Sequence, residues 1–248
     1  MAVDVQRLPE KIKKGPYWRI NFRPVAYKKD DENYYKISFD TVQKSQIRLR
    51  GWPYPYISND KCEQIRNSNY LASGLEYHGH IEYWRLYYSR QFINLFAVRE
   101  KTNLNWDEKL REQAKQWIML PDRLELSDIP GFIDIINLLY HLTEIFEFAS
   151  SLCSKDIYHG ELEIDIQIIN IEGFCLIAQY PRAWDEYYPA TSDSIIKSAL
   201  YHSGELVAKS SKLALDWAIY FFNQFGWDNP PLDILKQDQE KFLSSRAY

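Results

Sequence analysis

Alternation of apolar and polar side chains with a period of two residues dominates the first hundred residues, and it most constrains the fold. In residues 17–27, apolar positions alternate with tyrosine, arginine and asparagine. This pattern is typical of a strand with one buried face. Residues 81–100 carry the longest such pattern, which is either a hairpin turning near Ser89 and Arg90 or one long bent strand. We therefore expect four to six antiparallel strands in this part.

Residues 45–52 show the same alternation and predict a further strand. Pro53 and Pro55 follow directly, and a proline has no N–H group to donate to a strand ladder. This strand is therefore expected to lie at an edge of the sheet or to end in a turn.

Helical periodicity dominates the second half of the chain. Residues 131–153 carry apolar side chains three and four positions apart, after a proline that suits the first helical turn. Residues 204–227 carry a second such stripe, with Gly226 well placed as the C-terminal cap. Shorter helices are expected over residues 106–120 and 232–244.

A β-hairpin is expected between the two long helices. Residues 161–170 alternate strictly, and residues 173–180 are the predicted partner strand, with the turn at Glu172 and Gly173. The order of elements predicts an α+β fold. In this fold a mostly antiparallel sheet from the N-terminal half packs against two long helices and the further hairpin, with the helices on one face.

Charge is unevenly distributed along the chain, although we expect residues 1–248 to form a single compact domain. Residues 1–100, the β-rich part, hold 17 Lys and Arg against 11 Asp and Glu, a net charge of +6. Residues 101–248, the helix–hairpin–helix part, hold 13 against 23, a net charge of −10. This asymmetry favours either attraction between two surfaces of the same molecule or an anionic partner for the basic part.

Several function classes are excluded by what the sequence lacks. It contains neither GxGxxG nor GxxxxGK[ST], and its nine glycines make a phosphate-binding glycine loop improbable. No apolar run approaches a membrane span, so no membrane partner is expected. There is no GxSxG motif and no apolar leader, and the three cysteines share no close spacing, which favours the reducing cytoplasm.

Four aromatic-rich segments resemble a family of uncharacterised bacterial proteins. They are LRGWPYPYI (49–57), HIEYWRLYYSRQF (80–92), LTEIFEFASSL (142–152) and LALDWAIYFFNQFGW (213–227). The similarity extends over residues 17–228. The resemblance implies a bacterial cytosolic protein, and it carries no known activity, cofactor or catalytic residue.

The segment EYHGHIE contains a candidate metal site. If the segment is extended, Glu76, His78, His80 and Glu82 lie on one face. Two imidazoles and a carboxylate, His78, His80 and Glu82, suit Zn, Mn or Fe. A turn at Gly79 would remove the common face and leave the histidines bonding nearby carboxylates.

Two further polar groups are better explained as surfaces than as sites. Asp134, Asn137, His141, Glu144 and Ser151 form one stripe of the 131–153 helix, which predicts a solvated helix face. The second long helix offers no matching set of ligands for a di-metal centre. The acidic residues of strand 161–170 predict an outward-facing polar sheet surface rather than a nuclease centre.

Arginine and tyrosine side chains in the basic part form the candidate binding surface. Its members are Arg19, Arg23, Arg48, Arg50, Tyr83, Arg85 and Tyr87. If their strands are neighbours, guanidinium groups and tyrosine rings converge on one sheet face. Such a face suits phosphates and stacked bases, and equally an acidic protein surface. The alternative is a face that neutralises itself through Arg–Glu pairs.

Three functions remain open. The sequence favours a non-enzymatic recognition module without a cofactor, whose Arg/Tyr face binds an anionic ligand or an acidic partner. The first alternative is a metal-dependent enzyme built on His78, His80 and Glu82. The second alternative is a structural subunit of a bacterial multiprotein assembly. A protein partner or oligomer is expected, and a nucleic acid or nucleotide is the other candidate partner.

Overall fold

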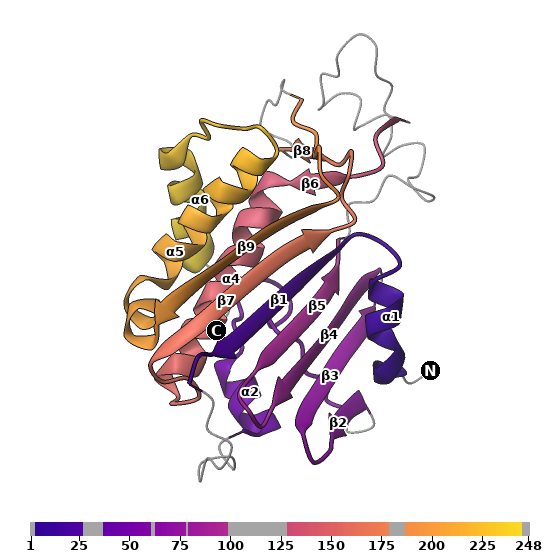
Figure 1. Ribbon diagram of the computed structural model, residues 1–248, viewed down its shortest axis with the longest axis vertical. Helices are drawn as coiled ribbons and strands as arrows, with labels where there is room; N and C mark the ends of the chain where they lie inside the picture. Colours follow the sequence, from indigo (N-terminus) through magenta and orange to yellow (C-terminus); the bar gives the residue numbers. More distant parts are fainter. Residues whose placement is uncertain are drawn as a thin grey trace.

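A computed structural model describes residues 3–26, 37–60, 63–77, 79–98, 128–178 and 187–244. The helix expected over residues 106–120 lies outside the described residues. A seven-stranded antiparallel sheet is the largest element of the described fold (Figure 1). Its spatial order is β2 (Gln64–Arg66), β3 (Tyr70–Tyr77), β4 (His80–Tyr87), β5 (Phe92–Ala97), β1 (Tyr17–Pro24), β7 (Glu161–Ile169) and β9 (Ser194–His202).

The first hundred residues supply five of these strands, as the alternation predicted. Along β1, Trp18, Ile20 and Phe22 are buried, whereas Arg19 and Arg23 on the opposite face are exposed. Of the two alternatives for residues 81–100, the structure has the hairpin: β4 and β5 pair, and Tyr87 N donates to Gln91 O at the turn. Each strand thus places its apolar residues on the face that the helices cover.

The prediction that residues 173–180 pair with residues 161–170 is wrong. Strand β7 pairs instead with β9, and β8 (Cys175–Ile177) pairs in parallel with β6 (Phe132–Asp134) in a separate two-stranded sheet. All three residues of β8 are buried, which suits a strand covered on both faces. Strand β9 alternates between exposed and less exposed residues, as an edge strand with one solvated face does.

The strand expected over residues 45–52 is also absent. Residues Phe39–Ser45 form helix α2, and only an isolated bridge joins Ile47 to Tyr54. The two prolines that follow explain why no ladder extends from this bridge.

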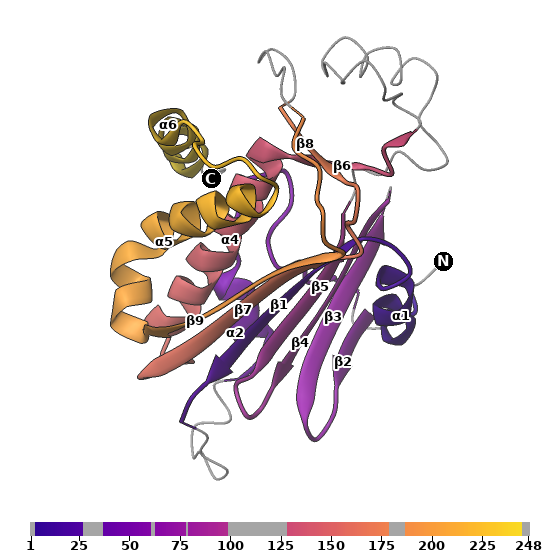
Figure 2. The same ribbon diagram turned by 45° about the horizontal axis from the view of Figure 1, so that its top comes forward.

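Three helices lie on one face of the sheet, which we call the inner face (Figure 2): α4 (Ile135–Ser154), α5 (Ser203–Gln224) and α6 (Leu232–Ser244). Helix α4 begins later than predicted because β6 precedes it, and the Asp134 carboxylate caps it by accepting from Asn137 N at 2.7 Å. Helix α5 ends before Gly226, whose φ of +87° confirms the predicted cap. Among the described residues, no helix has the length and apolarity to span a bilayer.

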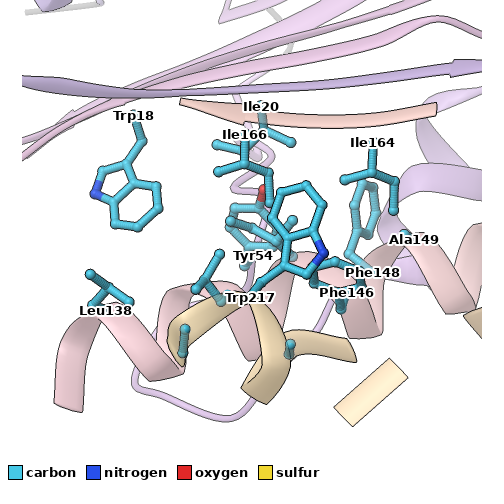
Figure 3. Packing of buried hydrophobic residues seen from close by; sticks show 14 of the residues in the cluster. Trp18, Ile20, Tyr54, Leu138, Phe146, Phe148, Ala149, Ile164, Ile166 and Trp217 are labelled. Carbon is cyan, nitrogen blue, oxygen red and sulfur yellow. The ribbon is translucent and has the colours of Figure 1, made fainter. Parts of the chain in front are cut away.

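The main core lies between the inner face and α4 and α5 (Figure 3). Sheet residues such as Trp18 and Ile166 meet Phe148 of α4 and Trp217 of α5. On the opposite or outer face, the 3-10 turn η1 (Val5–Arg7) and helix α1 (Leu8–Ile12) cover a smaller apolar cluster. The rest of the outer face carries polar side chains together with Ile196 and Leu200 of β9, which are 50% and 57% exposed.

Gly74 permits the close approach of α1 to the outer face. A Cβ atom at this position of β3 would lie 2.5 Å from Leu8 Cδ1 and 2.6 Å from Glu82 O. The second contact is with backbone, so Gly74→Ala is expected to lower the free energy of unfolding by about 1–3 kcal/mol. Urea denaturation measures this change. Gly51→Ala is the matched control, because no atom lies within 4 Å of the added Cβ there; equal losses in the two variants would contradict the packing of α1.

Candidate functional site

The outer face brings together five of the seven predicted binding residues. Tyr83, Arg85 and Tyr87 alternate along β4, and Arg19 and Arg23 alternate along β1. Strand β5 lies between them and pairs with both. Side chains two strands apart are separated by about 10 Å, so these residues share one surface.

Arg48 and Arg50 lie elsewhere, contrary to the prediction of one converging surface. Both belong to the irregular segment that follows α2 and runs across the inner side of the sheet, because the strand predicted there does not form. Arg48 is exposed beside α4, where it lines a surface hollow with Glu147 and Ser150. Arg50 reaches Glu144 of α4.

A hollow between α1 and the sheet is the centre of the outer surface. We call it the Arg85 hollow, and its volume is about 370 Å³. It is lined by Pro9, Lys13, Tyr17, Arg19, Tyr83, Arg85, Ile93 and Leu95. Two predicted strands and the residue that caps the short N-terminal helix, Lys13, therefore supply its cationic groups.

Tyrosines hold the Arg85 guanidinium in place. Nε donates to Tyr83 Oη at 2.8 Å and Nη1 donates to Tyr87 Oη at 2.9 Å, while the guanidinium stacks 4.1 Å from the ring centroid of Tyr70. Burial lowers the pKa of Arg85, but the hydrogen bonds to Tyr87 and Tyr83 outweigh it, and the pKa is raised overall. Arg85 is thus a fixed cation in an apolar and hydroxyl-lined setting.

The acidic strand β7 neutralises only part of the outer face. Arg23 forms an ion pair with Glu163, as the self-neutralising alternative predicted. Burial raises the pKa of Asp165, and the hydrogen bond from Gln167 and the charge of Arg19 oppose this rise only in part. Within the described ranges, no ion pair joins Lys13, Arg19 or Arg85 to a carboxylate.

A second polar cluster lies on the inner face, beneath α4. Arg50 Nε donates to Glu144 Oε1 at 3.1 Å, and Nη2 bonds both Glu144 Oε2 and His141 Nδ1, the latter at 2.9 Å. Burial raises the pKa of Glu144, and the positive charge of Arg50 opposes this effect. We call these three residues the Arg50 cluster.

Glu82 is buried next to the Arg50 cluster. Its Oε1 accepts from Asn94 Nδ2 at 3.0 Å and from Tyr56 N at 3.3 Å, and its Oε2 lies 3.4 Å from His80 Nε2. Tyr54 donates to Asn94 Oδ1 at 3.1 Å. Burial, reinforced by the negative charges of Glu82 and Glu144, raises the pKa of Tyr54 well above its ordinary value.

The predicted metal cluster is only partly described. His80 and Glu82 lie together on the inner face, whereas His78 falls outside the described residues. Gly79, with φ of +80°, sits between β3 and β4, so Glu76 lies on the outer face, where it pairs with Lys11. In the part of the chain that the structure describes, no group of three or more His, Cys, Asp or Glu residues is arranged to hold a metal. The three-residue ligand set therefore stays a prediction.

The polar stripe of α4 was wrongly assigned to solvent. Glu144 is 2% exposed, because Arg50 bonds it and covers this side of the helix. Asp134, the last residue of β6 just before the helix, is 3% exposed. The sequence contains a pattern that indicates this burial. Apolar residues precede and follow Glu144 along the chain, which predicts a helix that is buried on more than one side. The acidic residues of β7 do face outward, as expected.

The Cys153 thiol lies near the end of α4. Burial raises its pKa to about 12.

Comparisons of the chain with protein-family models, with curated proteins and with solved structures found no match. The argument for function therefore depends on the geometry of the two polar regions.

Proposed function

We propose that this protein is a non-enzymatic recognition module that binds an anionic group in the Arg85 hollow. The observation that carries the proposal is the setting of Arg85, whose guanidinium is oriented by two tyrosine hydroxyls and pairs with no carboxylate of the described residues. A cation held in this way has its geometry fixed before a ligand arrives, and its charge is still available.

The rest of the hollow supports the same ligand chemistry. Lys13 and Arg19 line it with Arg85, which gives three cations around a space of about 370 Å³. Tyr17 and Tyr83 also line the hollow, but they are only 9% and 3% exposed, so they supply apolar wall and hydroxyl groups rather than an open stacking platform. These features favour a phosphate of a nucleic acid or nucleotide, and an acidic protein surface is the alternative partner. The buried cysteine thiols agree with a cytoplasmic protein.

Arg85→Ala is expected to weaken anion binding strongly. Loss of charge-assisted hydrogen bonds to the ligand costs about 1.5–3 kcal/mol, or roughly tenfold to a hundredfold in Kd. Fluorescence anisotropy with a labelled single-stranded oligonucleotide measures this, and the affinity of the unaltered protein is expected to fall as salt rises. A labelled acidic peptide in the same assay distinguishes the alternative partner.

Arg48→Ala is the matched control for this experiment. Arg48 is an exposed arginine of the basic part that lies away from the hollow, so its removal changes net charge equally. Arg85→Lys tests geometry, because lysine keeps the charge but not the planar fork that two tyrosines hold. An equal loss of affinity in Arg48→Ala and Arg85→Ala would show that binding is not localised to the hollow.

A further inference from the structure

Arg85 and Tyr83 offer hydrogen-bond donors in the Arg85 hollow. A guanidinium has five N–H groups, and Arg85 uses one on Nε and one on Nη1 for Tyr83 and Tyr87, so three have no partner in the described residues. Because Tyr83 Oη accepts from Arg85, its own proton is left for a ligand oxygen. Burial raises the pKa of Tyr83, so this proton stays in place at neutral pH. An oxyanion with several oxygens matches this set of donors.

Two more cations line the hollow from other elements. Lys13 caps the C-terminal end of α1 and Arg19 belongs to β1; both are exposed, and neither forms an ion pair in the described part of the chain. Arg19 lies opposite the uncharged Gln167 of β7, which donates to the Asp165 carboxylate at 2.8 Å. No Asp or Glu is among the described residues that line the hollow. The cations of the hollow therefore exceed what one singly charged group neutralises.

The carbonyl groups at the end of α1 do not prevent an anion from binding beside Lys13. A helix C-terminus carries a partial negative charge on its free carbonyl groups. Here Asn170 Nδ2 donates to Lys13 O at 3.3 Å and to Gly15 O at 2.9 Å, and Lys13 N donates to Pro9 O at 3.1 Å. These bonds offset the partial charge and fix the backbone from which the Lys13 side chain extends.

The size and walls of the hollow suit one small ligand rather than a strand. Its volume of about 370 Å³ lies near the lower limit, about 300 Å³, of pockets that hold single small molecules. Ile93 and Leu95 of β5 line it between the two arginine-bearing strands, and Tyr17 is 9% exposed, so no open aromatic face is offered to a base. The space therefore suits a phosphate and its attached sugar, without a contact that reads the base.

A phosphomonoester matches these features better than an internal phosphodiester. It carries a charge of about −1.5 to −2 at pH 7 and three strong acceptor oxygens, whereas each phosphate within a strand carries a single negative charge. Given the anion site proposed above, on which this inference rests, we propose that the Arg85 hollow binds the terminal phosphate of a nucleotide or of an oligonucleotide end. Arg85 and Tyr83 donate to its oxygens, and Lys13 and Arg19 balance its second charge.

Two oligonucleotides of one sequence, labelled at the 3′ end, test the proposal by fluorescence anisotropy on the full chain. One carries a 5′-phosphate and the other a 5′-hydroxyl group. We expect the phosphorylated probe to bind about tenfold more tightly or better, because it adds charge-assisted hydrogen bonds. Equal affinities would overturn this proposal and leave the anion site standing. Binding of neither probe would overturn the anion site itself.

Competition against the phosphorylated probe identifies the chemistry and its source. Adenosine and uridine 5′-monophosphates are expected to displace it at similar concentrations, and dimethyl phosphate, a singly charged diester, is not. Displacement by both nucleotides supports a free nucleotide as the ligand, and displacement only by an unlabelled phosphorylated oligonucleotide supports a strand end. Displacement by dimethyl phosphate at the concentrations that suffice for the nucleotides would overturn the preference for a phosphomonoester.

Lys13→Ala tests whether the second charge is balanced in the hollow. It is expected to lower the preference for the 5′-phosphate over the 5′-hydroxyl probe by about threefold, the scale of one exposed cation. Lys14→Ala is the matched control, because Lys14 is the exposed neighbour that removes the same charge and does not line the hollow. An equal fall in the preference of both variants would overturn the assignment of Lys13.

Discussion

Replacing Arg50 with methionine is expected to lower the free energy of unfolding by about 3–5 kcal/mol. Glu144 is 2% exposed, and Arg50 supplies two hydrogen bonds and the opposite charge. Methionine keeps a similar apolar stem but leaves the carboxylate buried without its partner. The cost of a buried, unpaired charge greatly exceeds the small value of an exposed ion pair.

The effect of Arg50→Met is expected to depend on pH. Burial raises the pKa of Glu144 above its ordinary value of 4.5, and Arg50 limits this rise, so the pKa rises further in the variant. When the folded pKa exceeds the unfolded one, the folded state binds the proton more tightly, and stability falls as the pH rises through the folded pKa. The loss of stability is therefore expected to be largest near neutral pH and to shrink toward pH 4.5.

Guanidinium denaturation at several pH values measures both effects. The double variant Arg50→Met with Glu144→Gln removes the buried charge, and it is expected to recover much of the stability lost in Arg50→Met. If the loss in free energy of unfolding of Arg50→Met stays constant from acidic to neutral pH, the loss comes from the packing of the Arg50 stem rather than from the charge of Glu144.

The sequence was sufficient to predict the strands and helices whose periodicity is local. Alternation in β1 and β7 identified each strand and its buried face, and the long alternating run that holds β4 and β5 was recognised as β structure without being divided. The stripes of α4 and α5 identified both long helices. Pairing between β7 and β9 was missed because residues 170–193 separate the two strands in sequence, and β8 offered a nearer apolar partner. The short sequence separation between β7 and β8 favours a hairpin between these two strands. Because β8 is buried on both sides, it pairs with β6 instead.

The two polar regions differ in how far the sequence could predict them. Arg19, Tyr83 and Arg85 meet because each follows the alternation of its own strand, and only the order of strands was unknown. The Arg50 cluster joins positions 94 residues apart through an irregular segment, for which no periodicity exists. Glu144 on a predicted helix face therefore looked solvated until tertiary structure covered it.

Replacing Phe148 with alanine is expected to lower the free energy of unfolding by about 3–5 kcal/mol. This fully buried ring of α4 packs against Tyr54, with ring centroids 5.9 Å apart (Figure 3). It also packs against Phe92 at 5.1 Å and Phe22 at 6.3 Å. Alanine would leave a cavity that the surrounding sheet and helix cannot fill. Chemical denaturation measures the loss.

Tyr77→Ala is the control for this change, because Tyr77 is an aromatic residue that is 63% exposed. Tyr77→Ala is expected to lower the free energy of unfolding by less than about 1 kcal/mol. Phe148 also supports Tyr54, whose hydroxyl donates to Asn94, which in turn donates to Glu82. The apolar core thus holds these buried polar groups in position. A loss as small as that of Tyr77→Ala would contradict the packing of α4 on the sheet.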